Sequence, residues 1–445
     1  MRKIDSILSE TLKKIQPEKE ELILMHKEAK IFLEKIKKSI KELKIEAEPF
    51  IGGSFAKNTI VKKNNYDCDI FLRFTETNED ISKLANKIID KAKIKARVVH
   101  GSRDYFQIPI TDYFYIELLP VKKTETPESA ENITDLSYLH VKYLNKKIKS
   151  QKIIDDIKLI KAFCHAKECY GAESYINGFS GYSLELLIYH FNGFEKFLKE
   201  IVKKDKKQEQ YKNLWANDFE TKIKKWKNRI MIDIEKAYKN SNHILMDLNE
   251  SKLNSPIILI DPTFKERNVT AALSEETFKK FIIQAKNFLK NPKETDFKIK
   301  IEDVENIKKL SKKNNYEFIE LKISTTKQNG DIAGTKLKKF YKHLIEELKK
   351  IYEIKKSGFV YNKEQSAKIY FTVKKKNEII LKGPEKNNEL HVKAFKKEHK
   401  NAKIKGNRYI SIKKINFTLN EFIKKWQIRN KVKIKEMTIS KLKIL

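Results

Sequence analysis

The sequence predicts a multidomain α+β protein, and three observations support that prediction. A chain of 445 residues, 40% of them hydrophobic, is too long for one core and can fill several. Strand-like alternation and helical periodicity are mixed in the first third, whereas the middle third is mainly helical. Beyond about residue 280, short strands and helices return with many lysines. We expect a mixed-sheet head at 1–142, a mainly helical central domain at 143–275 and a basic α+β body and tail at 276–445.

The expected head begins with helices and continues as a sheet. Apolar residues recur at helical spacing between Ile4 and Leu43, and Pro17 marks a helix start within that range. A short strand is expected at 47–51. Further along the chain, the patterns predict a helix at 78–93 and strands at 66–72, 94–100, 105–110 and 112–121.

A small-residue turn and two aspartates lie between the first strands. The turn Gly52-Gly53-Ser54 lets backbone amides approach a phosphate, and Ser54 can cap the short helix expected after it. Asp67 and Asp69 share one face of a strand, where like charges repel and hard oxygen ligands suit Mg²⁺. Asp-x-Asp alone is more often a solvated polar face, and Gly-Gly-Ser alone is only a turn. Their combination favours a metal and phosphate site.

A third carboxylate, Glu117, lies in the alternating stretch DYFYIELLPV at 112–121. It shares a face with Tyr113, Tyr115 and Leu119. A charge placed between aromatic and aliphatic residues needs a partner. A metal ion held by the neighbouring strand would supply one.

These residues resemble the nucleotidyltransferase superfamily of DNA polymerase β and poly(A) polymerase. Further stretches are similar to the archaeal, class I CCA-adding enzymes (tRNA nucleotidyltransferases), and they occur in the family's order across nearly the whole chain. They are IELLPV at 116–121, LHVKYL at 139–144, DIKLIKAFCHAKECYGAES at 156–174, GFSGYSLELLI at 178–188, IDPTFKERNVTAALS at 260–274 and LKGPE at 381–385. The resemblance implies a polymerase β-like nucleotidyltransferase head, a helical central domain and an α+β RNA-binding body and tail.

The resemblance also implies a role for each candidate site residue. Asp67 and Asp69 would hold the Mg²⁺ that binds the incoming triphosphate, and with Glu117 a second Mg²⁺ that activates the 3′-hydroxyl of tRNA. The nucleotide itself would contact Gly53, Ser54, Lys57, His140, Lys161, Tyr170 and Arg267. Two residues depart from the family pattern, because Glu117 stands where Asp is usual and Lys57 where Arg is common. These departures leave rate and nucleotide fidelity open.

Three of the nucleotide contacts have a plainer explanation in the sequence itself. Lys161 lies in a helix that Ser150 can cap, where a lysine is usually solvated. A lone histidine such as His140 is more often a satisfied core or surface residue. Arg267 precedes a helix expected to begin near Ser274 and could cap it or form a salt bridge, whereas in the family its planar guanidinium helps to select the base.

The charge of the chain predicts a polyanionic partner. Its 95 Lys and Arg against 60 Asp and Glu give a formal net charge of +35. No apolar run of spanning length, lipidation signal or secretory signal is apparent in the sequence, so we expect no membrane partner. Three cysteines without C-x-x-C spacing favour a reducing cytoplasm and argue against structural zinc.

The basic residues concentrate toward the C-terminal end. Residues 341–445 hold 29 Lys and Arg against 10 Asp and Glu, a net charge of +19. The stretches FIELKIS, KLKKFYKHLIEELKKIY, GFVY and KIYFTVKK predict a βαβ-type RNA-binding fold. Aromatic residues are interleaved with these lysines, but strands need filling, so we expect many aromatics in the core and the lysines on RNA.

The resemblance therefore implies template-independent addition of CCA to the 3′ end of tRNA from CTP and ATP, with two Mg²⁺ ions and release of pyrophosphate. The basic half would hold the acceptor and T stems by shape, and members of the family often form homodimers through the tail. The alternatives are a poly(A)-type or oligonucleotide-synthesising nucleotidyltransferase and a non-catalytic tRNA-binding homologue. The presence of all three carboxylates argues against the last.

Overall fold

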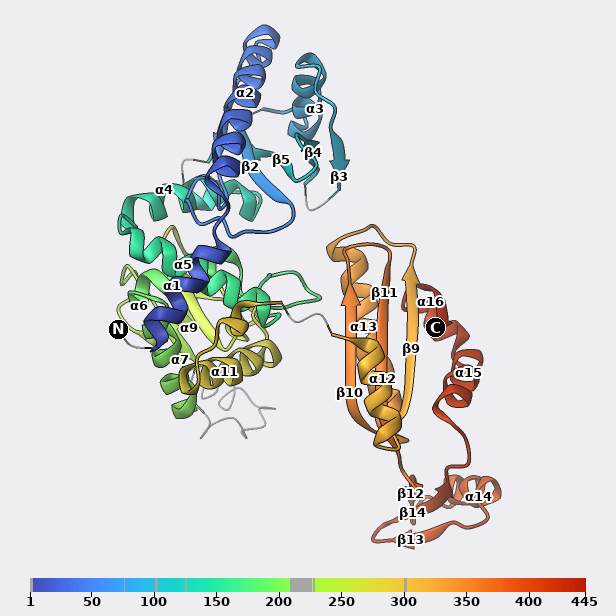
Figure 1. The fold of residues 1–445 in the computed structure, drawn as a ribbon. Coiled ribbons are helices and arrows are strands. Elements are labelled where there is room, and N and C mark those ends of the chain that lie inside the picture. The colour runs from blue at the N-terminus through green and yellow to red at the C-terminus, as the bar shows by residue number, and fades with distance from the viewer. Residues whose placement is uncertain are drawn as a thin grey trace. The chain divides into compact units, whose positions relative to one another are not determined.

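The structure of the protein is a computed structural model, and it describes residues 3–75, 77–100, 103–124, 126–208, 226, 229–299 and 302–445. The chain forms two compact units. The N-terminal unit comprises residues 1–172 and 176–300, and the C-terminal unit comprises residues 173–175 and 301–445. Both contain helices and sheets, so the predicted α+β class is confirmed (Figure 1). The three-domain division at 142 and 275 stays a prediction.

A five-stranded mixed sheet in the N-terminal unit carries the predicted aspartates. Its order is β1-β2-β5-β4-β3, with β2 parallel to β5 and the other neighbours antiparallel. The strands are β1 (Ala47–Ile51), β2 (Tyr66–Phe74), β3 (Arg97–Val99), β4 (Tyr105–Pro109) and β5 (Phe114–Lys122). All five lie at or within a few residues of the ranges that the alternation predicts.

Two helices cover one face of this sheet (Figure 1). They are α2 (Lys19–Leu43) and α3 (Ile81–Lys91), whose apolar residues pack on Tyr66, Cys68, Ile70 and Leu72 of β2. Because successive side chains of a strand alternate, Asp67 and Asp69 lie on the opposite face. The predicted helical range 4–43 is two helices, α1 (Lys3–Ile15) and α2, which separate at Pro17.

The remainder of the N-terminal unit is mainly helical, as predicted. Its core is built around Phe163, whose ring contacts Phe194, Phe281, Phe288 and Phe297 edge-on. The α-helices are α4 (Ser137–Lys147), α5 (Gln151–Ala166), α6 (Gly181–Phe191), α7 (Phe194–Gln208), α9 (Ser241–Asp247), α10 (Glu250–Leu253) and α11 (Glu275–Lys290). Short 3-10 turns are η1 (Pro127–Ser129), η2 (Ile133–Leu136) and η4 (Glu294–Phe297).

A small sheet interrupts this helical region, and the sequence predicts only part of it. The short apolar run at 257–261 predicts a strand, and this strand is β7 (Ile257–Asp261), which pairs with β6 (Ile230–Ile232) and β8 (Phe264–Asn268). The sequence pattern predicts a helical region that runs to about residue 250. This prediction is wrong at β6, because a three-residue strand is too short to show alternation. The charged, poorly patterned residues 203–216 predict a surface connection; residues 203–208 belong to α7, and the rest lie outside the described residues.

The C-terminal unit contains the predicted βαβ arrangement. The strand β9 (Glu317–Thr325), the helix α13 (Asp331–Lys349) and the strand β10 (Tyr352–Tyr361) form it, with β11 (Ser366–Lys375) inserted antiparallel between the two strands. The strand β15 (Ile439–Ile444) completes a sheet of order β10-β11-β9-β15. The remaining elements are α12 (Val304–Lys313), β12 (Glu378–Glu385), α14 (Glu389–Glu398), β13 (Lys403–Lys405), β14 (Arg408–Lys414), α15 (Leu419–Arg429) and α16 (Lys431–Glu436).

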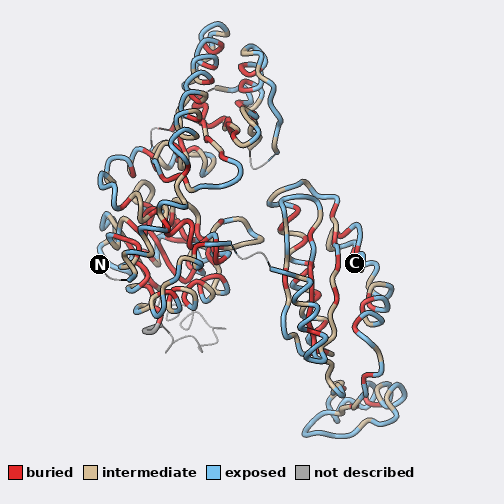
Figure 2. Tube along the Cα trace, viewed as in Figure 1, coloured by how far each residue is buried: buried red, intermediate tan, exposed pale blue. Residues whose placement is uncertain are grey.

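Burial separates core from surface in the C-terminal unit (Figure 2). Tyr341, Tyr352, Tyr370 and Phe371 are buried, which confirms that many of the aromatics interleaved with lysine fill the core. The small sheet β12-β14-β13 is largely exposed (Figure 2). None of the helices in the described ranges has both the length and the apolar character needed to cross a membrane.

Candidate active site

The two aspartates of β2 lie beside the predicted third carboxylate. Parallel pairing of β2 with β5 sets Asp69 opposite Glu117 and Asp67 opposite Tyr115. Asp67 forms an ion pair with Lys63 of the loop before β2. Burial raises the pKa of Asp69 to about 6, and the charge of Asp67 contributes in the same direction. The sheet therefore places both aspartates on the face opposite α2 and α3.

The turn after β1 approaches this carboxylate closely. Gly53 adopts a φ of +59°, and a Cβ on it would collide with the carboxylate of Asp69. Only glycine suits this position, because the left-handed conformation and the close approach both exclude a side chain. The residues that follow form hydrogen-bonded turns, with Thr59 N donating to Ser54 O at 3.0 Å, so the short helix expected after Ser54 is absent among the described residues.

The donor set of β2 and β5 fits a divalent cation in its chemistry. Carboxylate oxygens are the ligands that Mg²⁺ prefers, and a cation would oppose the burial and the charge of Asp67 that together raise the pKa of Asp69. Within the described ranges, no three His, Cys, Asp or Glu side chains converge closely enough to hold a metal ion. The three predicted ligands are thus neighbours on adjacent strands, with Lys63 on Asp67.

The two predicted phosphate lysines meet at one buried carboxylate. Lys57 Nζ donates to Oε2 of Glu185 at 2.6 Å, and Lys161 Nζ donates to Oε1 at 2.7 Å. Thr59 Oγ1 accepts from Lys161 at 2.8 Å and donates to Glu185 Oε1 at 3.1 Å. The loop after β1 is thereby joined to α5 and α6, and Lys161 is buried in this network, so it is no ordinary solvated lysine.

Charge and burial act against each other in this cluster. Burial alone would raise the pKa of Glu185, but Lys161 and Lys57 outweigh it and lower that pKa to about 2. Burial lowers the pKa of Lys161, whereas Glu185 raises it. The charge of Lys57 also lowers the pKa of Asp69, as does that of Lys63. The lysine cluster and the carboxylates of β2 therefore lie within electrostatic reach of each other.

Tyr170 belongs to the connection between α5 and α6, and its side chain lies beside the first turn of α6, near Lys161. A Cβ on Gly181 would lie 2.9 Å from Tyr170 Oη and 3.8 Å from Lys161 Cε, so this glycine borders both side chains. The ring of Tyr170 stacks on His165, with the ring centroids 3.9 Å apart. The predicted pair Lys161 and Tyr170 is therefore brought together at the N-terminus of α6.

His140 and Arg267 meet at a second buried acid, Asp261. Arg267 Nη1 donates to Asp261 Oδ2 at 2.6 Å, and His140 Nε2 lies 3.1 Å from both. Tyr182 Oη donates to Asp261 Oδ1 at 3.1 Å, and its ring stacks on His140 with the centroids 4.1 Å apart. Burial lowers the pKa of His140, which favours its neutral form, although Asp261 opposes the shift.

The helix α6 connects these two clusters. Tyr182 of the Asp261 cluster and Glu185 of the lysine cluster are three residues apart, about one turn of the same helix. The sequence does not identify Thr59, Tyr182, Glu185 or Asp261 as site residues. Glu185 could have been identified from the sequence, because a charge inside the apolar run LELLI needs a buried partner.

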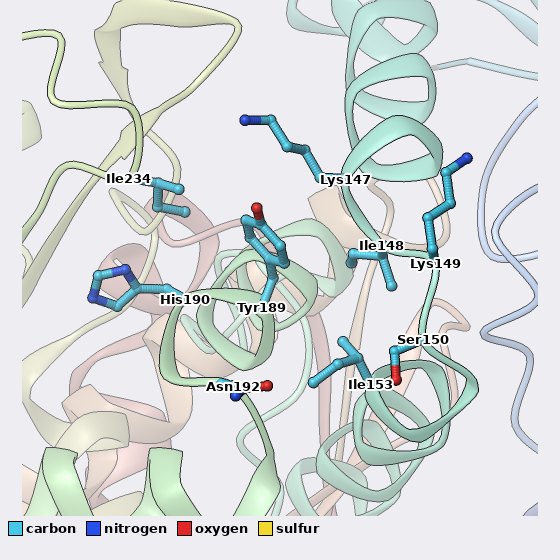
Figure 3. A pocket seen from close by; sticks show the side chains of 9 residues that line it. All are labelled: Lys147, Ile148, Lys149, Ser150, Ile153, Tyr189, His190, Asn192 and Ile234. Atoms are coloured by element: carbon cyan, nitrogen blue, oxygen red, sulfur yellow. The ribbon is translucent and has the colours of Figure 1, made fainter.

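One cavity adjoins Lys57 and Glu185, and a second, larger cavity shares two lining residues with it. The smaller has a volume of about 240 Å³, and Lys57, Thr59 and Glu185 are among its lining residues. The larger has a volume of about 540 Å³ and lies along the end of α4 and the C-terminal half of α6, where Figure 3 shows the ring of Tyr189 between Ile234 and Ile148. Ile148 and Lys149 line both cavities, whereas no predicted site residue lines the larger one.

A family model and curated relatives show which proteins this chain is similar to. The model for the second domain of tRNA nucleotidyltransferases matches residues 155–298. Residues 155–298 are therefore similar to the second domain of tRNA nucleotidyltransferases. The matched segment 155–298, called the second domain below, contains Lys161, Tyr170, Glu185, Asp261 and Arg267.

The relatives confirm the resemblance to archaeal CCA-adding enzymes. The CCA-adding enzyme of Nanoarchaeum equitans is 36% identical over 193 residues, which cover 43% of this chain and 42% of the relative. That of Methanocaldococcus jannaschii is 30% identical over 204 residues, or 44% of this chain and 45% of the relative. The chain thus spans less than half the length of the curated relatives it matches. A solved structure of CdnC with ATP from E. coli MS115-1 has a TM-score of 0.45 at 13% identity, covering 66% of this chain and 94% of that chain.

Proposed function

We propose that the protein adds C, C and A to the 3′ end of tRNA from CTP and ATP, without a template and with release of pyrophosphate. The observation that carries the proposal is the meeting of Lys57 and Lys161, 104 residues apart in the chain, at one buried point beside the carboxylates of β2. A site for a nucleoside triphosphate needs both parts, since phosphates require cations and the reacting hydroxyl requires activation.

In this proposal, different residues bind the phosphates and the base of the nucleotide. The backbone amides of Gly53 and Ser54 approach the β and γ phosphates, because the turn has no Cβ at Gly53. Lys57, Lys161 and Tyr170 bind the same phosphates. His140 and Arg267 face the base, and the planar guanidinium of Arg267 hydrogen-bonds a cytosine or adenine edge.

The carboxylates of β2 and β5 complete the proposed site. Asp67, Asp69 and Glu117 would hold two Mg²⁺ ions, which supply charge neutralisation for the phosphates and lower the pKa of the tRNA 3′-hydroxyl. The three carboxylates stand on adjacent strands, with Asp69 directly opposite Glu117.

The basic C-terminal unit is the proposed tRNA-binding part. Its surface lysines would follow the phosphates of the acceptor and T stems by shape rather than by sequence. A homodimer and action in the cytoplasm belong to the same proposal. Light scattering of the purified protein tests the dimer.

The test is incubation of the full chain with Mg²⁺ and a tRNA that lacks its CCA end. We expect CTP alone to add two residues and ATP to add one only after them, with no addition by an Asp67→Ala, Asp69→Ala variant. A long tail of A would instead assign the protein to the poly(A)-type transferases. No addition together with tight tRNA binding would leave a non-catalytic binding protein.

A further inference from the structure

Glu185 is a buried carboxylate that binds lysines from two different parts of the N-terminal unit. Its side chain is 1% exposed, and those of Lys161 and Lys57 are 5% and 11% exposed. Lys57 belongs to the loop after β1, Lys161 to α5 and Glu185 to α6. Each carboxylate oxygen accepts from one ammonium group, at 2.6 Å for Lys57 and 2.7 Å for Lys161. One side chain therefore sets the separation of two cations.

The arrangement leaves charge and hydrogen-bond donors unused. Two ammonium groups oppose one carboxylate, so the cluster keeps one net positive charge. Each ammonium group has three N–H donors. Among the described residues, the hydrogen bonds given above use one donor of Lys57 and two of Lys161. An anion that approaches the cluster thus meets both a positive charge and free donors.

We propose that Glu185 is a positioning residue of the triphosphate site, which holds Lys57 and Lys161 at a fixed separation and leaves one net positive charge for the β and γ phosphates of the incoming nucleotide. The inference rests on the proposed function. Without the carboxylate, the two buried ammonium groups would repel each other, and each would have to be neutralised or leave the site.

The protonation of Lys161 gives this role a measurable signature. Burial lowers the pKa of Lys161, and the charges of Lys57 and Lys63 lower it too, whereas the charge and hydrogen bond of Glu185 raise it. Removal of the carboxylate therefore lowers the pKa of Lys161 further. The variant would lose a phosphate-binding charge at a lower pH than the wild type does.

The experiment is calorimetric titration of the full chain with CTP and Mg²⁺ at pH 7 and pH 9. Glu185→Gln keeps the size of the side chain and removes the charge. We expect its Kd for CTP to exceed that of the wild type by about tenfold at pH 7, and the ratio to grow by up to about tenfold per pH unit once Lys161 titrates. Glu195→Gln on α7, which removes a carboxylate paired with Lys199, is the matched control and should leave the ratio at one.

The outcomes separate the inference from the function it rests on. An equal Kd in variant and wild type, or a ratio that is the same at both pH values, would overturn the inference while CCA addition stands. Absence of CTP binding by the wild type would overturn both. Unchanged tRNA affinity of Glu185→Gln is expected, because the basic surface lies elsewhere in the chain.

Two further variants keep the inference testable if Glu185→Gln unfolds. Glu185→Asp retains the charge on a shorter side chain, so it should weaken CTP binding but keep the wild-type pH dependence. In a Lys161→Gln background, Glu185→Gln should add no pH dependence, since the titrating group is gone. A pH-dependent ratio that survives there would show that Glu185 acts through another group.

Discussion

The carboxylates of β2 and those of the second domain are balanced in different ways. In the second domain, Glu185 is hydrogen-bonded to two lysines and Asp261 to Arg267, Tyr182 and Thr263. These partners hold the pKa of both acids below its ordinary value, although burial alone would raise it. On β2 the pKa of Asp69 is instead raised, because burial and Asp67 outweigh the lysines nearby.

The difference separates carboxylates whose charge is offset by the protein's own cations from carboxylates that a bound metal ion would stabilise. A buried carboxylate with two cationic partners is ionised at every physiological pH and organises its neighbours. A carboxylate beside a like charge, with its pKa raised, gains most from a cation supplied by solution. We therefore expect substitutions in the second domain to change stability or nucleotide affinity, and substitutions on β2 to change catalysis with little cost to the fold.

Replacement of both β2 aspartates is the strongest test of that contrast. Asp67→Ala, Asp69→Ala should lower the rate of nucleotide addition at least about a thousandfold, because the proposed metal ligands are lost. The melting temperature should stay the same or rise slightly, since two repelling charges are removed. Single-nucleotide gels and thermal melts measure the two effects. A variant that is active, or that is inactive only because it unfolds, would break the comparison.

Asp261→Asn should show the opposite behaviour in the second domain. An amide cannot neutralise Arg267, whose side chain is 18% exposed, so a partly buried cation loses its carboxylate partner, which costs up to about 3 kcal/mol of unfolding free energy. Urea unfolding followed by circular dichroism measures that loss. The control is Asp155→Asn, which removes a more exposed partner of Lys158 and should cost less than about 1 kcal/mol. Equal losses in the two variants would contradict the role given to Asp261.

The sequence reveals the acids of β2 better than those of the second domain, for a physical reason. Asp67 and Asp69 share a strand, so period-two alternation alone predicts that they share a face. Glu185 and Lys57 are 128 residues apart, and no local pattern encodes such a contact. The resemblance to a family identified Lys57, Lys161, His140 and Arg267, but only the folded chain shows which acid holds each pair.

The fold follows the same rule. Long helices and alternating strands such as β2 and β5 are predicted from their periodicity. The strand β6 has three residues, and β8 carries the polar sequence FKERN, so neither has a pattern to detect. Both strands exist because β7 between them is a buried apolar strand whose backbone groups need partners. Tertiary context, rather than local preference, decides such elements.

Acid titration tests how much Glu185 contributes to the free energy of unfolding. Its pKa of about 2 in the folded chain lies below the ordinary 4.5, so its stabilising contribution is complete above pH 4.5 and is lost as the pH falls toward 2. The shift corresponds to about 3 kcal/mol. When urea unfolding is repeated at lower pH, starting from pH 5, the free energy of unfolding should therefore fall less steeply for Glu185→Gln than for the wild type. A decline as steep as that of the wild type would place the acid sensitivity elsewhere, and Glu195→Gln should keep the wild-type slope.

Lys63 offers the smallest effect and the finest test of the idea that β2 awaits a cation. Lys63 forms an ion pair with Asp67 and is itself about half exposed, with a side-chain exposure of 47%. A divalent ion that binds Asp67 must displace this ammonium group. Removal of the lysine should therefore let the ion bind more tightly. Lys63→Ala should therefore lower the Mg²⁺ concentration for half-maximal activity by about two- to fivefold, in line with the modest strength of an exposed ion pair. The neighbouring Lys62→Ala removes a lysine that pairs with Glu18 instead and should leave the Mg²⁺ requirement unchanged. If Lys63→Ala instead raised the Mg²⁺ concentration for half-maximal activity, Lys63 would be a phosphate ligand rather than a competitor of the metal ion.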